Sequence, residues 1–202
     1  HGDEMDDAHN ASYGHPAAVL VPAALAVAER QGASGKDLIN AVVLGYDVGC
    51  RVSIAMDPVE LKRRDYHPSC LCGSFGAVAA AGRLLGLDHE QAVYALALTG
   101  SQASGVMGWM TEAKHMSKSF QTGVAARNGV TAALLAKLGY EGPKEVLEGR
   151  LNVFEAFTSK RDYGRVLEGL GSYHEIMRTS LKKYSAGHPI HGPLDGLLQI
   201  LN

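Results

Sequence analysis

The sequence predicts an all-α protein, built as an orthogonal bundle of several helices. Its 202 residues are rich in Ala, Leu and Gly, and only 6% of them are aromatic. Sustained alternation of Val, Ile or Thr with polar residues, which is typical of strands, is absent, whereas helix start and stop signals recur. Because 46% of the residues are hydrophobic and the composition does not change along the chain, residues 1–202 are expected to form one helical domain.

The first half of the chain has the clearest helix boundaries. Pro16 suits the first turn of a helix, and Gly32 suits its end. Ser34 and Asp37 form a capping box before the second helix. Charged residues and prolines without an apolar period follow, so residues 57–68 are expected to be irregular. Helices are therefore expected over 17–32, 37–56, 72–86 and 89–105.

The second half contains one long helix and several shorter ones. A connection rich in Gly and Met precedes the long helix, and Pro143 begins a short helix after it. The stretches GAVAAAG and GVAARNGVTAALLA carry small residues on several sides, which suits helices surrounded by others. Residues 149–160 are expected to be loop and turns. The expected helices are 117–139, 143–147, 174–182 and 193–201.

Charge and cysteine content disfavour several classes of protein. A net charge of −2 provides no overall basic field, so neither nucleic acid nor a membrane is expected as a partner. The apolar runs are interrupted by charge or Gly before they reach the length of a membrane span. Cys50, Cys70 and Cys72 form no CxxC pair and are expected to be buried side chains in a reducing compartment.

Most of the unusual polar residues fall in four irregular segments beside predicted helix ends. The first, residues 1–15, has four carboxylates within five positions and three histidines, but no Lys or Arg. The other three, 62–67, 111–121 and 182–191, supply Lys, Arg and further histidines. If the four segments converge, they form a pocket that can bind a polycarboxylate and move a proton beside a carboxylate carbon.

Each segment also has a simpler explanation. His15 and His67 both precede a Pro and could serve only to begin a helix, and Lys118 could point to water. A divalent metal held by Asp6 and Asp7, with nearby histidines, is a rival explanation, but the spacing fits no standard ligand pattern. A serine nucleophile is disfavoured because no GxSxG motif is present.

In their order along the chain, these segments resemble the MmgE/PrpD family. HGDEMDDAH with HPAAVLVPAALAVAE is similar to the family's acidic segment and first core helix, and YHPSCLCGSFGAVAAAGRLLGLD and KSFQTGVAARNGVTAALLAKLGYEGP follow in the family's order. The resemblance implies a helical domain that is joined, in whole members, to a smaller α+β lid domain and that usually forms a homodimer. The chain is therefore expected to be a piece that lacks the preceding helices and the lid.

The resemblance also implies which residues form the site. It places His67 and His15 at pocket histidines and Lys118 at a pocket lysine. Ala8 stands where decarboxylase-like members have Thr, and Gln121 stands where His is common. The expected catalytic residues are His67, His15, Lys118, Glu4 and Asp7, and the expected substrate-binding residues are Lys182, His9, Gln121 and Arg64.

The function implied by the resemblance is a lyase that needs neither cofactor nor metal. It is expected to be dehydratase-like, of the 2-methylcitrate dehydratase type, and to act on a small di- or tricarboxylic acid by proton transfer next to a carboxylate. Decarboxylation and epimerisation, which occur in the same family, stay open, as does a non-catalytic helical dimerisation scaffold. The expected location is the cytoplasm, or the mitochondrial matrix in a eukaryote.

Overall fold

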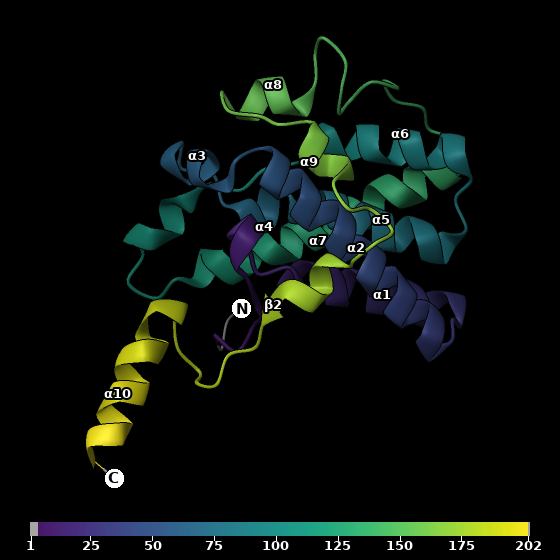
Figure 1. The fold of residues 1–202 in the computed structure, drawn as a ribbon. Coiled ribbons are helices and arrows are strands. Elements are labelled where there is room, and N and C mark those ends of the chain that lie inside the picture. Colours follow the sequence, from purple (N-terminus) through teal and green to yellow (C-terminus); the bar gives the residue numbers. More distant parts are fainter. Residues whose placement is uncertain (1–3, 202) are drawn as a thin grey trace.

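Five long helices form the body of the protein in a computed structural model, which describes residues 4–201 (Figure 1). Helix α5 lies at the centre and contacts the other four. The prediction of an all-α fold is confirmed, since the strands of the described residues are two short segments that pair with each other. The five helices are α1 (Ala17–Gln31), α2 (Gly35–Ala55), α5 (Gly73–Leu85), α6 (His89–Gly100) and α7 (Met116–Lys137).

Local signals set the boundaries of these helices. Ser34 and Asp37 form the predicted capping box, in which the backbone N–H of Asp37 donates to Ser34 Oγ over 3.2 Å. A second capping box, formed by Asp88 and Gln91, begins α6. Helix α1 ends at Gly32, whose φ of 60° places it in the left-handed region that terminates many helices.

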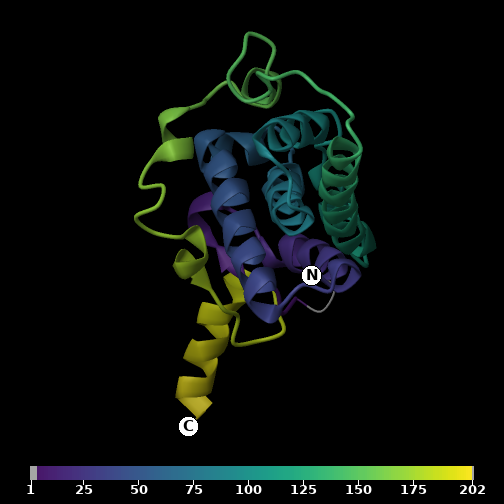
Figure 2. The ribbon, with the colours of Figure 1, turned by 90° about the vertical axis from the view of Figure 1, so that its right-hand side faces the viewer.

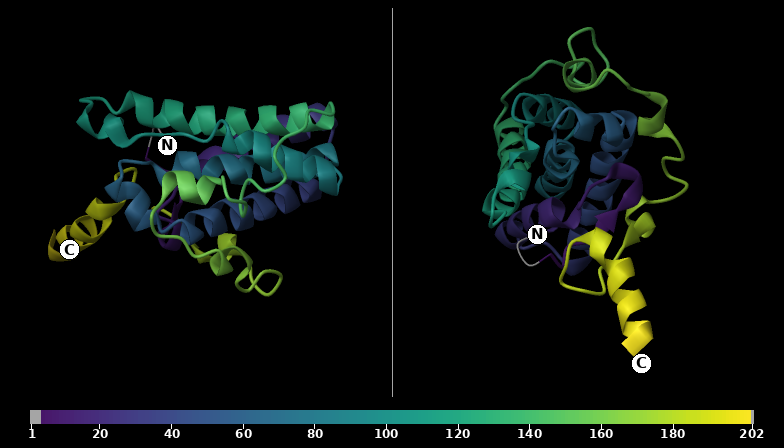
Figure 3. Two further views of the ribbon diagram at one scale, coloured as in Figure 1. Left: turned by 90° about the horizontal axis from the view of Figure 1, so that it is seen from above. Right: turned by 90° about the vertical axis from the view of Figure 1, so that its left-hand side faces the viewer.

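Small residues allow α5 to lie in the middle of the bundle. A Cβ atom built on Gly76 of α5 would lie 2.5 Å from the carbonyl oxygen of Gly45 in α2, so the two backbones touch at this point. Nine residues of α5 are buried, among them Phe75 and Val78. This burial agrees with the prediction that a helix with small residues on several sides is surrounded by others. Figures 2 and 3 show α5 enclosed by neighbouring helices.

Several short segments differ from the sequence-based predictions. Residues 57–68 are partly helical, because Asp57 caps a short helix by accepting from the N–H groups of Val59 and Glu60. Residues 143–147 form turns instead of a helix. The predicted helix over 174–182 is a 3₁₀ turn followed by a strand.

The short elements are η1 (Asn10–Ser12), α3 (Pro58–Arg63), α4 (Pro68–Leu71), η2 (Met107–Thr111), α8 (Val153–Phe157), α9 (Gly164–Leu167), η3 (Glu175–Arg178) and η4 (His188–Ile190).

Two stretches have the length and composition of a membrane span, contrary to the prediction that every apolar run falls short of one. They are α2 and the segment Pro68–Leu85, which comprises α4 and α5. Within the fold, 56% and 72% of their apolar windows are buried. Helix α2 also buries the charged side chains of Asp47 and Arg51. Core helices of a globular domain have these properties, and the packing of both stretches is that of core helices.

The last helix, α10 (His191–Leu201), extends away from the body of the protein (Figures 1 and 2). None of its residues is buried. Its exposed apolar side chains are Leu197, Leu198, Ile200 and Leu201.

Candidate active site

A cavity of about 750 Å³ lies where the four polar segments meet. Each segment contributes to its lining, so the predicted convergence of the segments is confirmed. The charged and imidazole-bearing residues of the lining are Glu4, His9, His15, Lys62, His67, His115, Lys118 and His188.

A short antiparallel ladder joins two segments that are far apart in the sequence and lie beside the cavity. Strand β1 (Ala8–His9) pairs with β2 (Thr179–Ser180), with Ala8 opposite Ser180. Beside the ladder, His9 Nε2 lies 3.1 Å from a carboxylate oxygen of Glu175, and both side chains are buried. These contacts hold the acidic segment next to the segment that contains Lys182.

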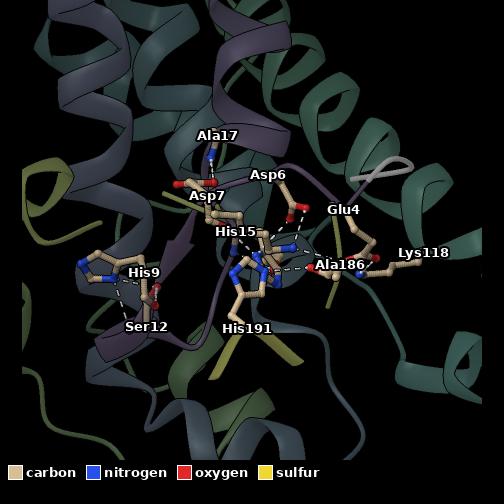
Figure 4. Close-up of polar contacts among 12 residues, drawn as sticks. Glu4, Asp6, Asp7, His9, Ser12, His15, Ala17, Lys118, Ala186 and His191 are labelled. Atoms are coloured by element: carbon tan, nitrogen blue, oxygen red, sulfur yellow. Dashed lines mark hydrogen bonds and ion pairs between the residues drawn. The ribbon is translucent and has the colours of Figure 1, made fainter. Parts of the chain in front are cut away.

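A row of alternating charges runs along one side of the site (Figure 4). The ammonium group of Lys118 donates to Glu4. The second oxygen of Glu4 accepts from Lys182 over 3.2 Å, and Lys182 also donates to Asp6 over 3.2 Å. Asp6 in turn lies 3.0 Å from Nδ1 of His15. Two lysines and two carboxylates therefore neutralise each other here.

The lysines and His15 keep both carboxylates ionised. Burial raises the pKa of Glu4, but its contacts with Lys118 and Lys182 lower this pKa by more, so the net shift is downward. Burial likewise opposes the ionisation of Asp6, but His15 and Lys182 hold its pKa well below the usual value. At neutral pH both groups therefore accept hydrogen bonds.

His15 is oriented by acceptors on one side of its ring. Its Nδ1 lies 2.6 Å from the carbonyl oxygen of Asp7, which can only accept, and 3.0 Å from the ionised carboxylate of Asp6. The proton of the neutral ring is therefore on Nδ1, and Nε2 carries the lone pair. The backbone N–H of His15 donates to Ser69 Oγ over 3.0 Å, which fixes the start of α1.

His67 lines the cavity as a neutral imidazole. Its residue is 4% exposed, and burial lowers its pKa to about 4. Gln121 donates from Nε2 to the carbonyl oxygen of Val106 over 2.7 Å, so its Oε1 faces Nδ1 of His67 at 3.4 Å. Sγ of Cys70 lies 3.2 Å from the same nitrogen.

Asp7 does not line the cavity. Its carboxylate accepts from the hydroxyl of Tyr46 over 2.6 Å and from the backbone N–H of Ala17 over 3.0 Å. Burial raises the pKa of Asp7, although these two hydrogen bonds oppose the shift. Asp7 therefore acts on the site through its carbonyl group, which holds His15, and this differs from the prediction that its carboxylate takes part in catalysis.

Three predicted substrate-binding side chains also make hydrogen bonds with other residues of the chain. Both ring nitrogens of His9 are hydrogen bonded, to Ser12 and to Glu175, so none is left for a substrate. Lys182 is almost fully buried between its two carboxylates and does not line the cavity. Gln121 lies behind His67 and orients it.

Arg64 points away from the site. Its guanidinium group donates to the carbonyl oxygen of Phe157 over 2.8 Å, and it does not line the cavity. From the same basic turn, Lys62 lines the cavity instead. Lys62 lies within α3 and Arg64 one residue past its end, where the carbonyl group of the distant Phe157 holds the guanidinium away from the cavity.

Two aromatic residues of the cavity lining are not among the residues predicted from the sequence. The ring of Trp109, in η2, lies 5.4 Å from the ring of His67, and the ammonium of Lys118 lies 5.3 Å from the Trp109 ring centroid. The ring of Tyr13 is contacted by Lys62. Trp109 is the one tryptophan in the chain and lies in a predicted connection, which was the signal available in the sequence.

The structure does not support the rival hypothesis of a metal held by the acidic segment. Residues 4–201 contain no group of three or more His, Cys, Asp or Glu side chains arranged to hold a metal ion. Asp6, Asp7 and His9, the ligands considered from the sequence, instead contact Lys182, Tyr46 and Glu175. His1 and Asp3 lie outside the described residues.

The helical fold and the polar cavity agree with the resemblance to the MmgE/PrpD family, and comparison with known proteins identifies the family. The chain belongs to the MmgE/PrpD family, since residues 1–166 match the model of the MmgE/PrpD N-terminal domain.

Several curated proteins are similar to the chain. It is 35% identical to a cis-aconitate decarboxylase-like protein of Aspergillus oryzae, over 96% of this chain and 43% of that protein. It is 33% identical to the cis-aconitate decarboxylase of Aspergillus terreus, over 96% of this chain and 42% of the relative. The human cis-aconitate decarboxylase is 31% identical, over 99% of this chain and 42% of its own length. The chain thus spans less than half the length of these relatives.

Proposed function

We propose that the protein containing this chain is a lyase that acts on a small di- or tricarboxylic acid. The observation that carries the proposal is the cavity itself, whose lining combines imidazole rings, among them His15 and His67, with the ammonium group of Lys118. An ammonium beside the reacting carbon stabilises the negative charge that develops when a proton or carbon dioxide leaves. An imidazole can supply or remove the proton near neutral pH. The names of the relatives support the same class of substrate.

In this proposal Lys118 binds a substrate carboxylate, and His15 transfers the proton. The hydrogen bonds from Nδ1 of His15 to Asp6 and Asp7 hold the tautomer whose Nε2 is basic, and the carboxylate of Asp6 stabilises the ring once it is protonated. His67, whose pKa is about 4, is neutral at pH 7 and acts as a hydrogen-bonding group or a weak base. Glu4 keeps Lys118 in position.

The proposed lyase reaction could break either a carbon–carbon bond, in decarboxylation, or a carbon–oxygen bond, in dehydration. Decarboxylation of a substrate such as cis-aconitate is favoured by the names of the three relatives. Dehydration of the 2-methylcitrate type is the second candidate. It is favoured by Ala8, which lines the cavity without the hydroxyl of the Thr found in decarboxylase-like members, and by Gln121 in place of His.

Assays of the intact protein separate these reactions. The protein is incubated with cis-aconitate, 2-methylcitrate and related acids in D₂O, and products are followed by NMR together with release of carbon dioxide. Incorporation of deuterium next to a carboxylate is expected, and His15→Asn and Lys118→Met are expected to lower kcat/KM by roughly 100-fold or more. His89→Gln, at an exposed position at the start of α6, is the control.

Two outcomes would contradict the proposal. A folded protein that is inert toward every acid tested would favour the non-catalytic scaffold. Activity that is lost with a chelator and restored by a divalent ion would favour the metal-dependent alternative.

We also propose that the intact protein is a homodimer located in the cytoplasm, or in the mitochondrial matrix of a eukaryote. The exposed apolar side chains of α10 support association with further protein surface. Light scattering after size-exclusion chromatography tests the dimer, and a monomer at micromolar concentration would contradict it.

A further inference from the structure

Lys62 is a cation of the cavity lining that forms no ion pair with a carboxylate among residues 4–201. It lies in the last turn of α3, and its ammonium group is 4.9 Å from the centroid of the Tyr13 ring, which also lines the cavity. The contact with the ring limits where the ammonium can go and leaves its positive charge uncompensated. Partial desolvation of the ammonium by the surrounding lining lowers the pKa of Lys62, although the residue as a whole is exposed.

The other two lysines of the site are already neutralised. Lys118 is paired with Glu4, and Lys182 with Glu4 and Asp6. These four side chains carry two positive and two negative charges, so they add no net charge to the site. Of the two lysines that line the cavity, Lys62 is therefore the one whose ammonium has no carboxylate partner among residues 4–201.

We propose that Lys62, supported by Tyr13, binds a second carboxylate of the substrate, so that the cavity is a two-point site for a dicarboxylate or tricarboxylate. Lys118 and Lys62 belong to different elements, the first turn of α7 and the last turn of α3, and they reach the same cavity. Two such contacts favour an acid with two separated carboxylates over an acid with one. The inference rests on the proposed function for the class of ligand.

The test measures binding of unreactive acids to the intact protein by isothermal titration calorimetry. The probes are tricarballylate, succinate and butyrate, which carry three, two and one carboxylates. Lys62→Gln is expected to weaken the binding of tricarballylate and succinate roughly tenfold, with a change of less than about twofold for butyrate. Lys62→Arg keeps the charge and is expected to retain most of the affinity.

Lys114→Gln is the matched control, because Lys114 is an exposed lysine that does not line the cavity. It removes the same charge and is expected to leave all three affinities within about twofold. The melting temperature of each variant shows whether it is folded. Because Lys62 and Lys114 are both exposed, no large change is expected.

Three results would overturn the inference. The first is that Lys62→Gln leaves the affinities for succinate and tricarballylate unchanged. The second is that Lys62→Gln and Lys114→Gln lower these affinities equally. The third is that the unsubstituted protein does not bind succinate more tightly than butyrate. Because the probes do not react, the result is independent of turnover. Binding that depends on Lys62 in a protein without lyase activity would refute the proposed function alone.

Discussion

Acidification from pH 7 to pH 5 is expected to destabilise the protein through His67. The ring is buried, and burial lowers its pKa to about 4 from the ordinary value of 6.5. Between these two values the unfolded chain binds a proton at this position and the folded chain does not. The free energy of unfolding therefore falls as the pH falls from about 6.5 to about 4.

The size of the effect follows from the two pKa values of His67. They differ by about 2.5 units, and since one unit corresponds to about 1.4 kcal/mol, the full loss is about 3 kcal/mol below pH 4. Integration between pH 7 and pH 5 gives about 2 kcal/mol of this loss. His9, whose pKa is also lowered by burial, changes stability in the same direction.

Urea unfolding at pH 7 and pH 5 measures the effect, with His67→Gln and the exposed-site control His89→Gln compared with the unsubstituted protein. The contribution of His9 is common to all three and cancels in the comparison. The loss between the two pH values is expected to be about 2 kcal/mol smaller in His67→Gln than in the other two proteins. An equal loss in all three, or an NMR titration that places the pKa of His67 near 6.5, would refute the reasoning.

Two further substitutions test the packing and the support of the site by urea unfolding. Gly129→Ala is expected to lower the free energy of unfolding by about 1–3 kcal/mol, because its Cβ would lie 2.5 Å from Cβ of Ala77 in α5. Gly123→Ala, in the same helix, meets no atom within 4 Å and is expected to raise the free energy of unfolding by about 0.5–1 kcal/mol. Gains in both would contradict the close packing of α5 and α7. Tyr46→Phe removes a hydrogen bond to the buried carboxylate of Asp7 and is expected to cost about 1–3 kcal/mol, so a loss below about 0.5 kcal/mol would contradict its role.

The long helices could be predicted from the sequence because their signals are local. The capping box at Ser34 and Asp37 and the left-handed Gly32 lie within a few residues of the boundaries that they set. Local signals do not decide the structure of short segments, because a helix of fewer than about 12 residues is not stable alone. Contacts with distant elements decide their structure, as where the strand at 179–180 pairs with Ala8 and His9.

The predicted meeting of four polar segments is confirmed, but the part played by individual side chains required the structure. Lys62 and Arg64 are two residues apart, yet only Lys62 faces the cavity. The partners of His9 and Asp7, which are Glu175 and Tyr46, are far away in the chain, and no local pattern links them. Which member of a polar cluster faces a cavity depends on such distant partners.

The ladder between β1 and β2 has a consequence for the order in which the protein is made. The residues of α1 to α7 emerge from the ribosome before Glu175, Lys182 and His188. A helical core can therefore begin to form cotranslationally while the cavity still lacks the lining residues of the 182–191 segment. The acidic segment, which is synthesised before these helices, receives its buried lysine only after all of them have been made. The ability to bind a ligand is thus acquired after the helical core, and nascent chains truncated before the second strand should be compact yet unable to retain an anionic ligand.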